Sequence, residues 1–309
     1  GWRQTSPWAA SIDNSRVWRV SQWQPRAWAD TSFAARQREG QRWDRESLAP
    51  RYNLLDDVDL ISAAGSMQSL DFALYRQTAL ARGVRHGGWK FPSESVARRA
   101  GVDFFLGPDV GPMPGFTPVE VDGAPADTQL LRIDGPAPRR VRIAHEVLSL
   151  PTLPQQATPG EVLARTREVL DAIERAPAGA VVEWDGQFLP PPDDRAPAED
   201  EERVDIVRLA PSEVVVAGRL AQPGLVVLAD AYDPGWRCET DAGPLPIVRA
   251  DRIFRGIWLP AGKFELRFRY RPSGFFLGAA VSAAAWAVLL LAAARAAWTA
   301  RRKRSATQI

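Results

Sequence analysis

The longest apolar stretch of the chain lies close to its C-terminus. Residues 272–294, PSGFFLGAAVSAAAWAVLLLAAA, contain no charged side chain. Four basic residues follow, and they are candidate contacts to the membrane interface: Arg301, Arg302, Lys303 and Arg304. A helix rises about 1.5 Å per residue, so roughly 20 apolar residues cross a hydrocarbon layer of about 30 Å. The pattern predicts a transmembrane helix over residues 272–298, and the positive-inside rule predicts a cytoplasmic tail over 299–309. A buried core helix is the alternative, but it leaves the basic tail unexplained.

The region before this helix, residues 204–271, has the pattern of short strands. Its apolar runs are separated by turns that contain Pro or Gly: Val204–Leu209, Glu213–Arg219, Leu225–Asp230, Arg237–Thr240, Ile247–Ala250, Phe254–Leu259 and Phe264–Tyr270. Short strands at such intervals are typical of an antiparallel sandwich or barrel. Asp233-Pro234-Gly235 has Pro and Gly in the order of a type II turn. The aromatic residues expected to be largely buried here are Trp236, Phe254, Trp258 and Phe268.

Residues 119–203 predict an α+β segment. One amphipathic helix is expected over 159–176, because Thr158 and Glu161 form a capping box and Pro159 opens the helix. Strands are expected at Val119–Val121, Leu130–Ile133, Val141–Val147 and Ala180–Trp184. The acidic, Pro-rich segment Pro190–Glu202 is interpreted as a solvated loop, with cation binding as a weaker alternative.

Residues 1–118 predict a Trp- and Arg-rich mixed segment of helix, strand and loop. A strand is expected at Arg16–Val20 and a helix near Ser69–Ala81, while residues 83–118 read mostly as loop, with one short strand at Val102–Leu106. The predicted fold class is therefore α+β, mainly β: an extracytoplasmic, antiparallel β-sandwich-like domain followed by one C-terminal transmembrane helix.

The tryptophans near the N-terminus have three interpretations. Trp2 and Trp8 could lie at the lipid headgroup layer, where Trp is enriched and the neighbouring arginines meet phosphate. The rings could instead stack on a glycan, or, as for Trp18, belong to the core. The pattern of the residues leaves all three open.

Composition narrows the class of protein. The formal net charge is +2, and the basic tail alone carries four positive charges, so the remainder is slightly acidic and no nucleic-acid partner is expected. A single cysteine, Cys238, excludes an intrachain disulfide. The chain opens at Gly1 without a Met or a signal-like segment, so we expect it to be the C-terminal piece of a longer membrane protein.

Candidate chemistry is sparse. His86 and His145 stand in unrelated contexts, so the sequence predicts no catalytic residue, no metal site and no cofactor. Cys238 is expected to lie inert in a strand. Tyr232 and Trp236 beside the predicted turn are candidate glycan contacts, although the favoured role of Trp236 is to close the end of the sandwich. On the membrane helix, a row of small residues could pack against another helix: Gly274, Gly278 and Ser282.

One run of residues supports a family resemblance. Residues 228–236 read LADAYDPGW, followed by PIVRA at 246–250, FRG at 254–256, LPAG at 259–262 and FRYRP at 268–272. In order and spacing this resembles the C-terminal region of the bacterial YfhO family of multi-pass membrane proteins. The chain departs from the family pattern at Ala242, which interrupts the usual Asp-Gly pair, and at Cys238.

The resemblance implies a function as well as a topology. The family resembles glycosyltransferases that use a polyprenyl-phosphate sugar at the outer face of the membrane, with the acidic base in an early outer loop that this chain lacks. We therefore expect an accessory part of such a protein in the bacterial plasma membrane, with the large domain outside. The expected partners are membrane lipid, upstream membrane helices of the same protein, the lipid-linked sugar and a cell-surface glycan. The alternatives are a membrane-anchored carbohydrate-binding module and a ligand-free structural or assembly domain.

Overall fold

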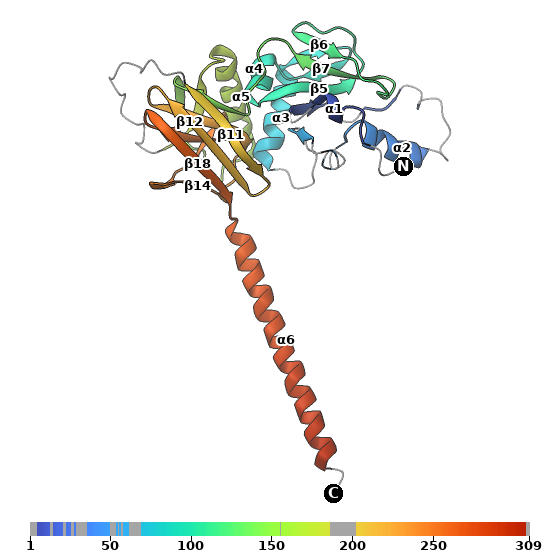
Figure 1. Ribbon diagram of the computed structural model, residues 1–309, viewed down its shortest axis with the longest axis vertical. Coiled ribbons are helices and arrows are strands. Elements are labelled where there is room, and N and C mark those ends of the chain that lie inside the picture. Colours follow the sequence, from blue (N-terminus) through green and yellow to red (C-terminus); the bar gives the residue numbers. More distant parts are fainter. Residues whose placement is uncertain are drawn as a thin grey trace.

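The protein consists mainly of β-sheets and ends in one long apolar helix (Figure 1). The computed structural model describes residues 5–12, 15–20, 23–25, 28, 36–49, 54, 56, 58–61, 69–154, 156–185 and 202–306. Three larger sheets and one hairpin account for the strands in these residues, and short helices cover the sheets. The mainly β class expected from the sequence is confirmed.

The N-terminal sheet is mixed. Its strand order is β2-β1-β5-β7-β6, with β1 parallel to both β2 and β5 and the remaining pairs antiparallel. The strands are β1 (Arg16–Arg19), β2 (Asp59–Leu60), β5 (Val102–Pro108), β6 (Phe116–Val119) and β7 (Thr128–Ile133). The helices of this part are α1 (Ala9–Ile12), α2 (Arg36–Glu46), α3 (Leu70–Arg82) and α4 (Glu94–Arg99).

The central sheet combines strands from distant parts of the sequence. Its order is β8-β13-β17-β16-β10-β9, and only the β9–β10 pair is parallel among its described pairs. The strands are β8 (Val141–Ala144), β9 (Val147–Leu150), β10 (Ala180–Glu183), β13 (Gly224–Ala231), β16 (Val248–Ala250) and β17 (Phe254–Leu259). Strands before and after residue 203 therefore share one sheet.

The outer sheet is antiparallel and packs on one face of the central sheet. Its order is β11-β12-β18-β14-β15. The strands are β11 (Arg203–Ala210), β12 (Glu213–Leu220), β14 (Trp236–Thr240), β15 (Gly243–Leu245) and β18 (Gly262–Tyr270). Alternate residues of the two sheets, such as Val226, Ile257, Leu266 and Phe268, enclose one apolar core.

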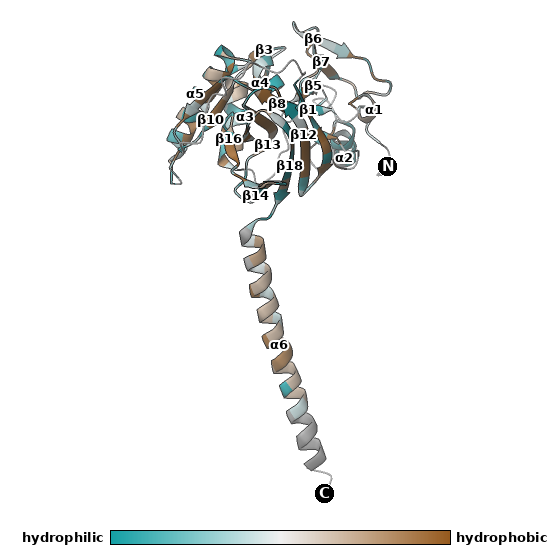
Figure 2. Ribbon diagram, turned by 60° about the vertical axis from the view of Figure 1, so that its left-hand side comes forward, coloured by the Kyte–Doolittle hydropathy of each residue, from teal (hydrophilic) through white to brown (hydrophobic). Residues whose placement is uncertain are grey.

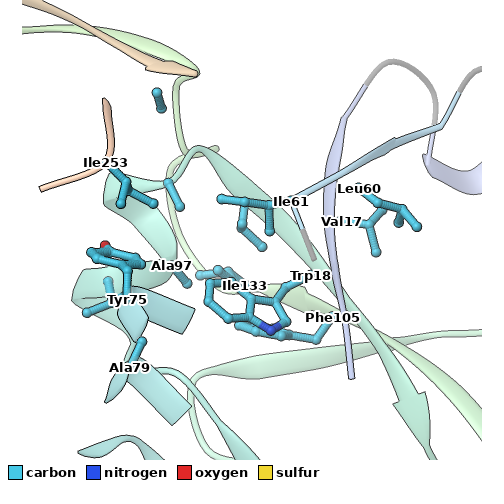
Figure 3. Packing of buried hydrophobic residues seen from close by; sticks show 14 of the residues in the cluster. Val17, Trp18, Leu60, Ile61, Tyr75, Ala79, Ala97, Phe105, Ile133 and Ile253 are labelled. Carbon is cyan, nitrogen blue, oxygen red and sulfur yellow. The ribbon is translucent and has the colours of Figure 1, made fainter. Parts of the chain in front are cut away.

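The other face of the central sheet belongs to a second, larger core. Leu225, Val227 and Phe254 contribute to it together with the N-terminal sheet and α5 (Pro159–Arg175). Figure 3 shows part of this core, where Trp18 from β1 lies near Phe105 from β5 with ring centroids 6.5 Å apart. Because β13 contributes side chains to both cores, it is buried along nearly its whole length.

The amphipathic helix α5 is confirmed together with its capping box. The Thr158 side chain accepts the Glu161 backbone N–H, and the Glu161 carboxylate accepts the Thr158 N–H at 2.7 Å. The helix buries its apolar face, including Val169 and Ile173, in the larger core. The capping signal and the 3.6-residue period identified this helix correctly.

The expectation that residues 83–118 are mostly loop was wrong. They form the hairpin β3 (Val84–His86) and β4 (Trp89–Phe91), then α4 and β5. Gly87 and Gly88 connect the hairpin with positive φ angles, as a two-residue hairpin turn of this kind requires. The Ser93 hydroxyl accepts the Val96 N–H and caps α4. These elements are too short to show a clear period in the sequence.

Most of the described N-terminal tryptophans lie in the core. Trp8 is only 1 % exposed, so its ring is not available to lipid headgroups, contrary to the interface interpretation. Trp18, Trp23 and Trp43 are buried too, and the Trp23 and Trp43 rings meet edge to face at 5.9 Å. Trp2 lies outside the described residues. Packing of large rings therefore explains this tryptophan-rich segment.

The C-terminal helix α6 (Ser273–Ala306) projects away from the sheets (Figure 1). Its segment Gly274–Trp298 is long and apolar enough to cross a membrane, and the most apolar part of that segment makes no buried contact with the rest of the protein. Figure 2 shows the apolar colouring along most of this helix. These features weakly suggest association with a membrane.

Candidate functional site

Asp230, near the end of β13, is the centre of a buried ionic cluster. Its carboxylate is 8 % exposed and accepts hydrogen bonds from three arginines. The donors are Arg16 Nη2 at 2.9 Å, Arg140 Nε at 2.8 Å and Arg255 Nη2 at 3.0 Å. Arg16 comes from β1, Arg140 from the residue before β8 and Arg255 from β17, so one carboxylate joins three parts of the fold.

Arg16 extends this cluster into the N-terminal sheet. Its Nε donates to Asp59 Oδ2 at 2.9 Å, and its Nη1 donates to the backbone carbonyls of Ala100 and Ala229. Arg140 also reaches Asp59 at 2.8 Å. The guanidinium of Arg16 therefore connects the N-terminal sheet with the central sheet through hydrogen bonds to charged and backbone acceptors.

The ion pairs within the cluster determine the protonation states of its side chains. Burial alone would raise the pKa of Asp230, but Arg140, Arg16 and Arg255 outweigh it and lower that pKa to about 2. Burial lowers the pKa of Arg255 to about 10, against the opposing effect of Asp230. At neutral pH Asp230 is thus an ionised structural acceptor, and its pKa is far too low for an efficient general base.

Arg255 also connects the cluster with Trp236. The Arg255 Cζ atom lies 3.9 Å from the centroid of the Trp236 ring and 5.4 Å from that of Phe268. Its Nε and Nη1 atoms are buried without a hydrogen-bond acceptor in the described part of the chain. The aromatic rings therefore provide the main compensation for this face of the buried cation.

The turn at Asp233–Trp236 packs against the segment that enters α6. Trp236 N–H donates to Asp233 O at 3.1 Å, and Gly235 N–H donates to Asp233 Oδ1 at 2.7 Å. Arg271 N–H then donates to Gly235 O at 2.7 Å. The Trp236 and Tyr270 ring centroids lie 5.2 Å apart. The turn thus holds the last residues of β18 in place immediately before the helix.

The type II turn expected from Asp233-Pro234-Gly235 is not formed, because Gly235 does not have a positive φ. The glycine is needed for space instead. A Cβ atom at this position would lie 2.7 Å from Tyr270 Cε2 and 3.2 Å from Pro272 Cα. Close approach to the α6 junction, and not backbone conformation, requires a glycine here.

The two candidate glycan contacts each have an arginine over one ring. Arg249 Cζ lies 4.7 Å from the Tyr232 centroid, and Arg255 occupies the corresponding position at Trp236. Both aromatic side chains are half-buried. Each ring therefore has at most one face left for a ligand. Of the four aromatic residues expected to be largely buried, Phe254 and Phe268 are fully buried, and Trp236 and Trp258 are half-buried.

Other carboxylates of the interior have arginine partners as well. Asp251 is fully buried and binds Arg99 at 3.0 Å and Arg142 at 2.5 Å, while accepting the Val181 N–H at 2.9 Å. Glu183 binds Arg252 through both of its oxygens at 2.8 Å. These ion pairs connect the central sheet with the surrounding loops and helices. These Arg–carboxylate pairs are structural, and their carboxylates are not available to accept a hydrogen bond from a ligand.

The remaining candidate groups offer little chemistry. His145 Nε2 lies 2.8 Å from Glu202 Oε2, and no group of three metal-ligating side chains comes together within the described residues. Cys238 lies in β14, where burial raises the pKa of its thiol to about 12 and keeps it protonated, as expected of an inert cysteine. Most of the acidic segment Pro190–Glu202 lies outside the described residues.

Two open clefts of about 330 and 360 Å³ lie beside α4 and α5, and Arg99 lines both. Their arginines are already engaged. Arg98 donates to Glu94 and to the carbonyl of Pro136, and Arg99 donates to Pro177 O and Asp251. Because these donors are used within the protein, the clefts are weaker candidates for a binding site than the end of the sandwich beside α6.

The small residues of α6 have no contact with the rest of the described protein. A Cβ atom at Gly274 or Gly278 would meet nothing within 4 Å, and Ser282 is exposed. The backbone of Arg301, Arg302, Lys303 and Arg304 continues the helix, and their side chains lie outside the description. The proposed helix-packing and headgroup roles of these residues stay predictions.

Sequence reasoning overlooked the ionic cluster around Asp230. A signal was present, because Arg255 alternates with Ile257 and Leu259 along β17 and so belongs to the same inward face. Asp230 likewise ends a continuous apolar run, Leu225–Ala229. A charge of each sign at inward positions of adjacent strands indicates a buried pair. Arg16 and Arg140, from distant elements, carried no comparable signal.

No protein-family model matches the chain, and neither a curated protein nor a solved structure does so. The resemblance to the YfhO family therefore stays a prediction that rests on residues 228–272.

Replacing Asp230 by Asn should lower the free energy of unfolding by about 3–5 kcal/mol, because the buried Arg16 and Arg255 and the half-buried Arg140 would lose their shared counter-charge. Denaturant unfolding followed by tryptophan fluorescence measures the change. Asp241→Asn is the matched control, since Asp241 is exposed at the β14–β15 turn and should alter stability by less than about 0.5 kcal/mol. Equal effects of the two variants would contradict the central role of Asp230.

The contribution of Asp230 should also depend on pH. Its pKa is lowered from 3.8 to about 2 in the folded protein, so the stabilisation is complete above pH 4 and is lost as the pH falls through 2. The shift corresponds to about 2 kcal/mol. The stability difference between the natural chain and Asp230→Asn should therefore shrink between pH 5 and pH 2. A difference that stays constant over this range would show that the carboxylate does not titrate as described.

Proposed function

We propose that this chain is the extracytoplasmic domain and last membrane helix of a YfhO-like membrane protein, with an accessory role in transferring sugar from a polyprenyl-phosphate donor to a cell-surface glycan. Its role would be to bind the acceptor or to support the membrane-embedded active site. The basic residues after the apolar segment would face the cytoplasm, which puts the large domain on the outer side.

The observation that carries this proposal is the position of Trp236. Its half-buried ring lies on the turn that packs against the α6 junction, and it contacts Tyr270 and the buried cation Arg255. If α6 spans the membrane, this aromatic group lies at the height of the headgroups. A lipid-linked sugar presents its phosphate and sugar at the same height. An aromatic ring at this position is therefore suited to support a substrate or acceptor.

An accessory role agrees with the state of the carboxylates. A general base in glycosyl transfer needs an available carboxylate within hydrogen-bond reach of the acceptor hydroxyl. Asp230 is held by three arginines with a pKa of about 2, and Asp251 is fully buried between two others. Neither side chain is suited to that task. In line with the resemblance to the YfhO family, the proposal assigns the catalytic base to another part of the protein.

A ligand-free assembly domain is the second candidate function. It is favoured by the arginines that cover one face of Tyr232 and one face of Trp236, because covered rings are weak platforms for a sugar. A membrane-anchored carbohydrate-binding module would require the remaining faces to bind glycan. The two functions make opposite predictions about glycan binding by the intact chain.

Topology provides the first test. In intact spheroplasts, an added protease should digest residues 1–270, while a tag after Ile309 should be cut only after the membrane is permeabilised. The expectation follows from the uncharged span and the basic residues behind it. Protection of the large domain in intact spheroplasts would reverse the orientation and overturn the proposed function.

Glycan binding provides the second test. If Trp236 supports a sugar, Trp236→Ala should weaken binding of the full chain to cell-wall glycan about tenfold, or about 1.4 kcal/mol. Trp258→Ala is the matched control, because Trp258 is also half-buried but lies on β17 among residues of the larger core. Surface plasmon resonance on the detergent-solubilised chain measures both. Absence of glycan binding by the natural chain would favour the ligand-free assembly domain.

A further inference from the structure

The strand that leads into α6 leaves almost no spacer before the helix. β18 ends at Tyr270 and α6 begins at Ser273, so two residues separate sheet from helix. An extended chain covers at most about 3.6 Å per residue, and the headgroup layer on each side of a bilayer is about 5–8 Å thick. If α6 spans the membrane, the end of the outer sheet must therefore lie at the headgroups.

Two turns fix the direction in which the chain leaves the outer sheet. Tyr270 N–H donates to Ser212 O, in the turn between β11 and β12, at 2.9 Å. Arg271 N–H donates to Gly235 O, in the turn between β13 and β14, at 2.7 Å. Both turns contact the residues at which the chain leaves the outer sheet. If α6 spans the membrane, both turns therefore lie as close to the membrane as these residues do. We call the exposed and half-buried residues at this end the rim: Leu209, Trp236, Arg237, Tyr270 and Arg271.

The rim carries two arginines that form no ion pair among the described contacts, while the Asp233 carboxylate of the adjacent turn interacts with Tyr270. Arg237 lies directly opposite Arg269 in the antiparallel pair β14–β18, and like charges at such positions repel each other. Arg269 has acidic neighbours, Glu213 at 3.2 Å and Glu239 at 3.6 Å. Arg237, in contrast, donates only to the carbonyls of its own turn, Pro234 O and Trp236 O, among the described contacts.

Arg271 is the second of these two arginines. It follows Arg269 by two residues and so lies on the same outward face of the chain as β18 ends. Its side chain is exposed, and no carboxylate in the described part of the protein forms an ion pair with it. Two exposed guanidinium groups, Arg237 and Arg271, thus stand beside the turn that holds the α6 junction. Guanidinium groups bind phosphate oxygens through paired N–H donors.

The rest of the rim is apolar or aromatic. Leu209, on the edge strand β11, is 53 % exposed, and Tyr270 is 37 % exposed beside Trp236. Leu, Trp, Tyr and Arg side chains at one end of a sheet form a mixture that is typical of a membrane interface. The chemistry of the rim therefore corresponds to that of the headgroup layer.

We infer that the rim binds the phosphate groups of anionic phospholipids in the same leaflet that α6 enters, through Arg237 and Arg271. Leu209 and Tyr270 meet the upper part of the acyl region and the glycerol level. These contacts hold the domain against the membrane surface and keep Trp236 at the level of the headgroups. This inference rests on the membrane anchor that is part of the proposed function, but it requires neither a glycan nor a lipid-linked sugar.

The test places a spin label on the full chain in lipid nanodiscs. Cys238→Ala removes the native thiol, and Leu209→Cys or Lys263→Cys supplies the labelling site. Lys263 is exposed on β18 but lies eight residues from Arg271, about 26 Å along the strand. A nickel chelate attached to lipid headgroups should relax the label at position 209 strongly and the label at position 263 weakly. Equal relaxation at the two positions would overturn the inference.

The charge dependence is measured by increasing the phosphatidylglycerol fraction in discs of phosphatidylcholine. The relaxation at position 209 should rise with this fraction and reach a midpoint. Each arginine near an anionic surface accounts for roughly a fivefold change in binding, so Arg237→Glu or Arg271→Glu, which remove a positive charge and add a negative one, should each move the midpoint more than about fivefold higher. Arg237→Gln and Arg271→Gln should move it in the same direction without a new negative charge. Lys263→Glu is the matched control and should leave it unchanged.

The outcomes separate this inference from the proposed function. A chain that is not recovered in the disc fraction would contradict the membrane anchor itself. Recovery in discs with a midpoint that is the same for Arg237→Glu and Lys263→Glu would contradict only the role of the rim. Dipolar broadening between labels at position 209 would show a second copy of the chain on this surface, which would also overturn the assignment to lipid.

Discussion

The carboxylate of Asp230 is the interaction on which the arrangement of the sheets depends. It neutralises Arg16, Arg140 and Arg255, which come from three separate parts of the chain, in a region with little access to water. Burying any one of these guanidinium groups alone would be costly, because a charge removed from water needs a compensating partner. The N-terminal sheet, the central sheet and the sandwich interior therefore meet correctly only when all three arginines reach the same acceptor.

This cluster also explains why a candidate site lies at the α6 end of the sandwich. Asp230 orients Arg255, and Arg255 lies over the ring of Trp236, which in turn contacts Tyr270. A continuous set of contacts thus runs from the buried ionic cluster to the residues that enter α6. A change at Asp230 is expected to reach the α6 junction through this path, because each side chain in it is held by the next.

The same part of the protein relates the proposed function to the inference about the rim. Glycan or lipid-linked sugar would meet Trp236, whereas Arg237 and Arg271, near the same turn, would bind headgroup phosphates. Seating the domain on the membrane would hold the aromatic ring at a constant height. The rigidity of the Asp233–Trp236 turn, with its hydrogen bonds to the junction, gives this arrangement a structural basis.

The helices and strands that were predicted correctly were recognised from patterns among residues close in sequence. The capping box at Thr158 and Glu161 identified α5, alternation identified most strands of the outer sheet, and an uncharged run identified α6. Each of these rests on interactions between residues close in sequence. The short hairpin and helix within 83–118 were missed, since a turn of two glycines and a single capping serine give too little periodicity.

The sequence by itself thus determined the mainly β class, the amphipathic helix and the apolar C-terminal segment, because hydrophobic period and capping are local properties. Only the tertiary structure decided which strands share a sheet, that Trp8 belongs to a core, and that Asp230 gathers three arginines. It also decided that Gly235 serves a close contact with Tyr270 in place of a left-handed turn. The physical reason is that these features join residues tens to hundreds of positions apart, and pairing over such separations is set by the packing of the whole chain.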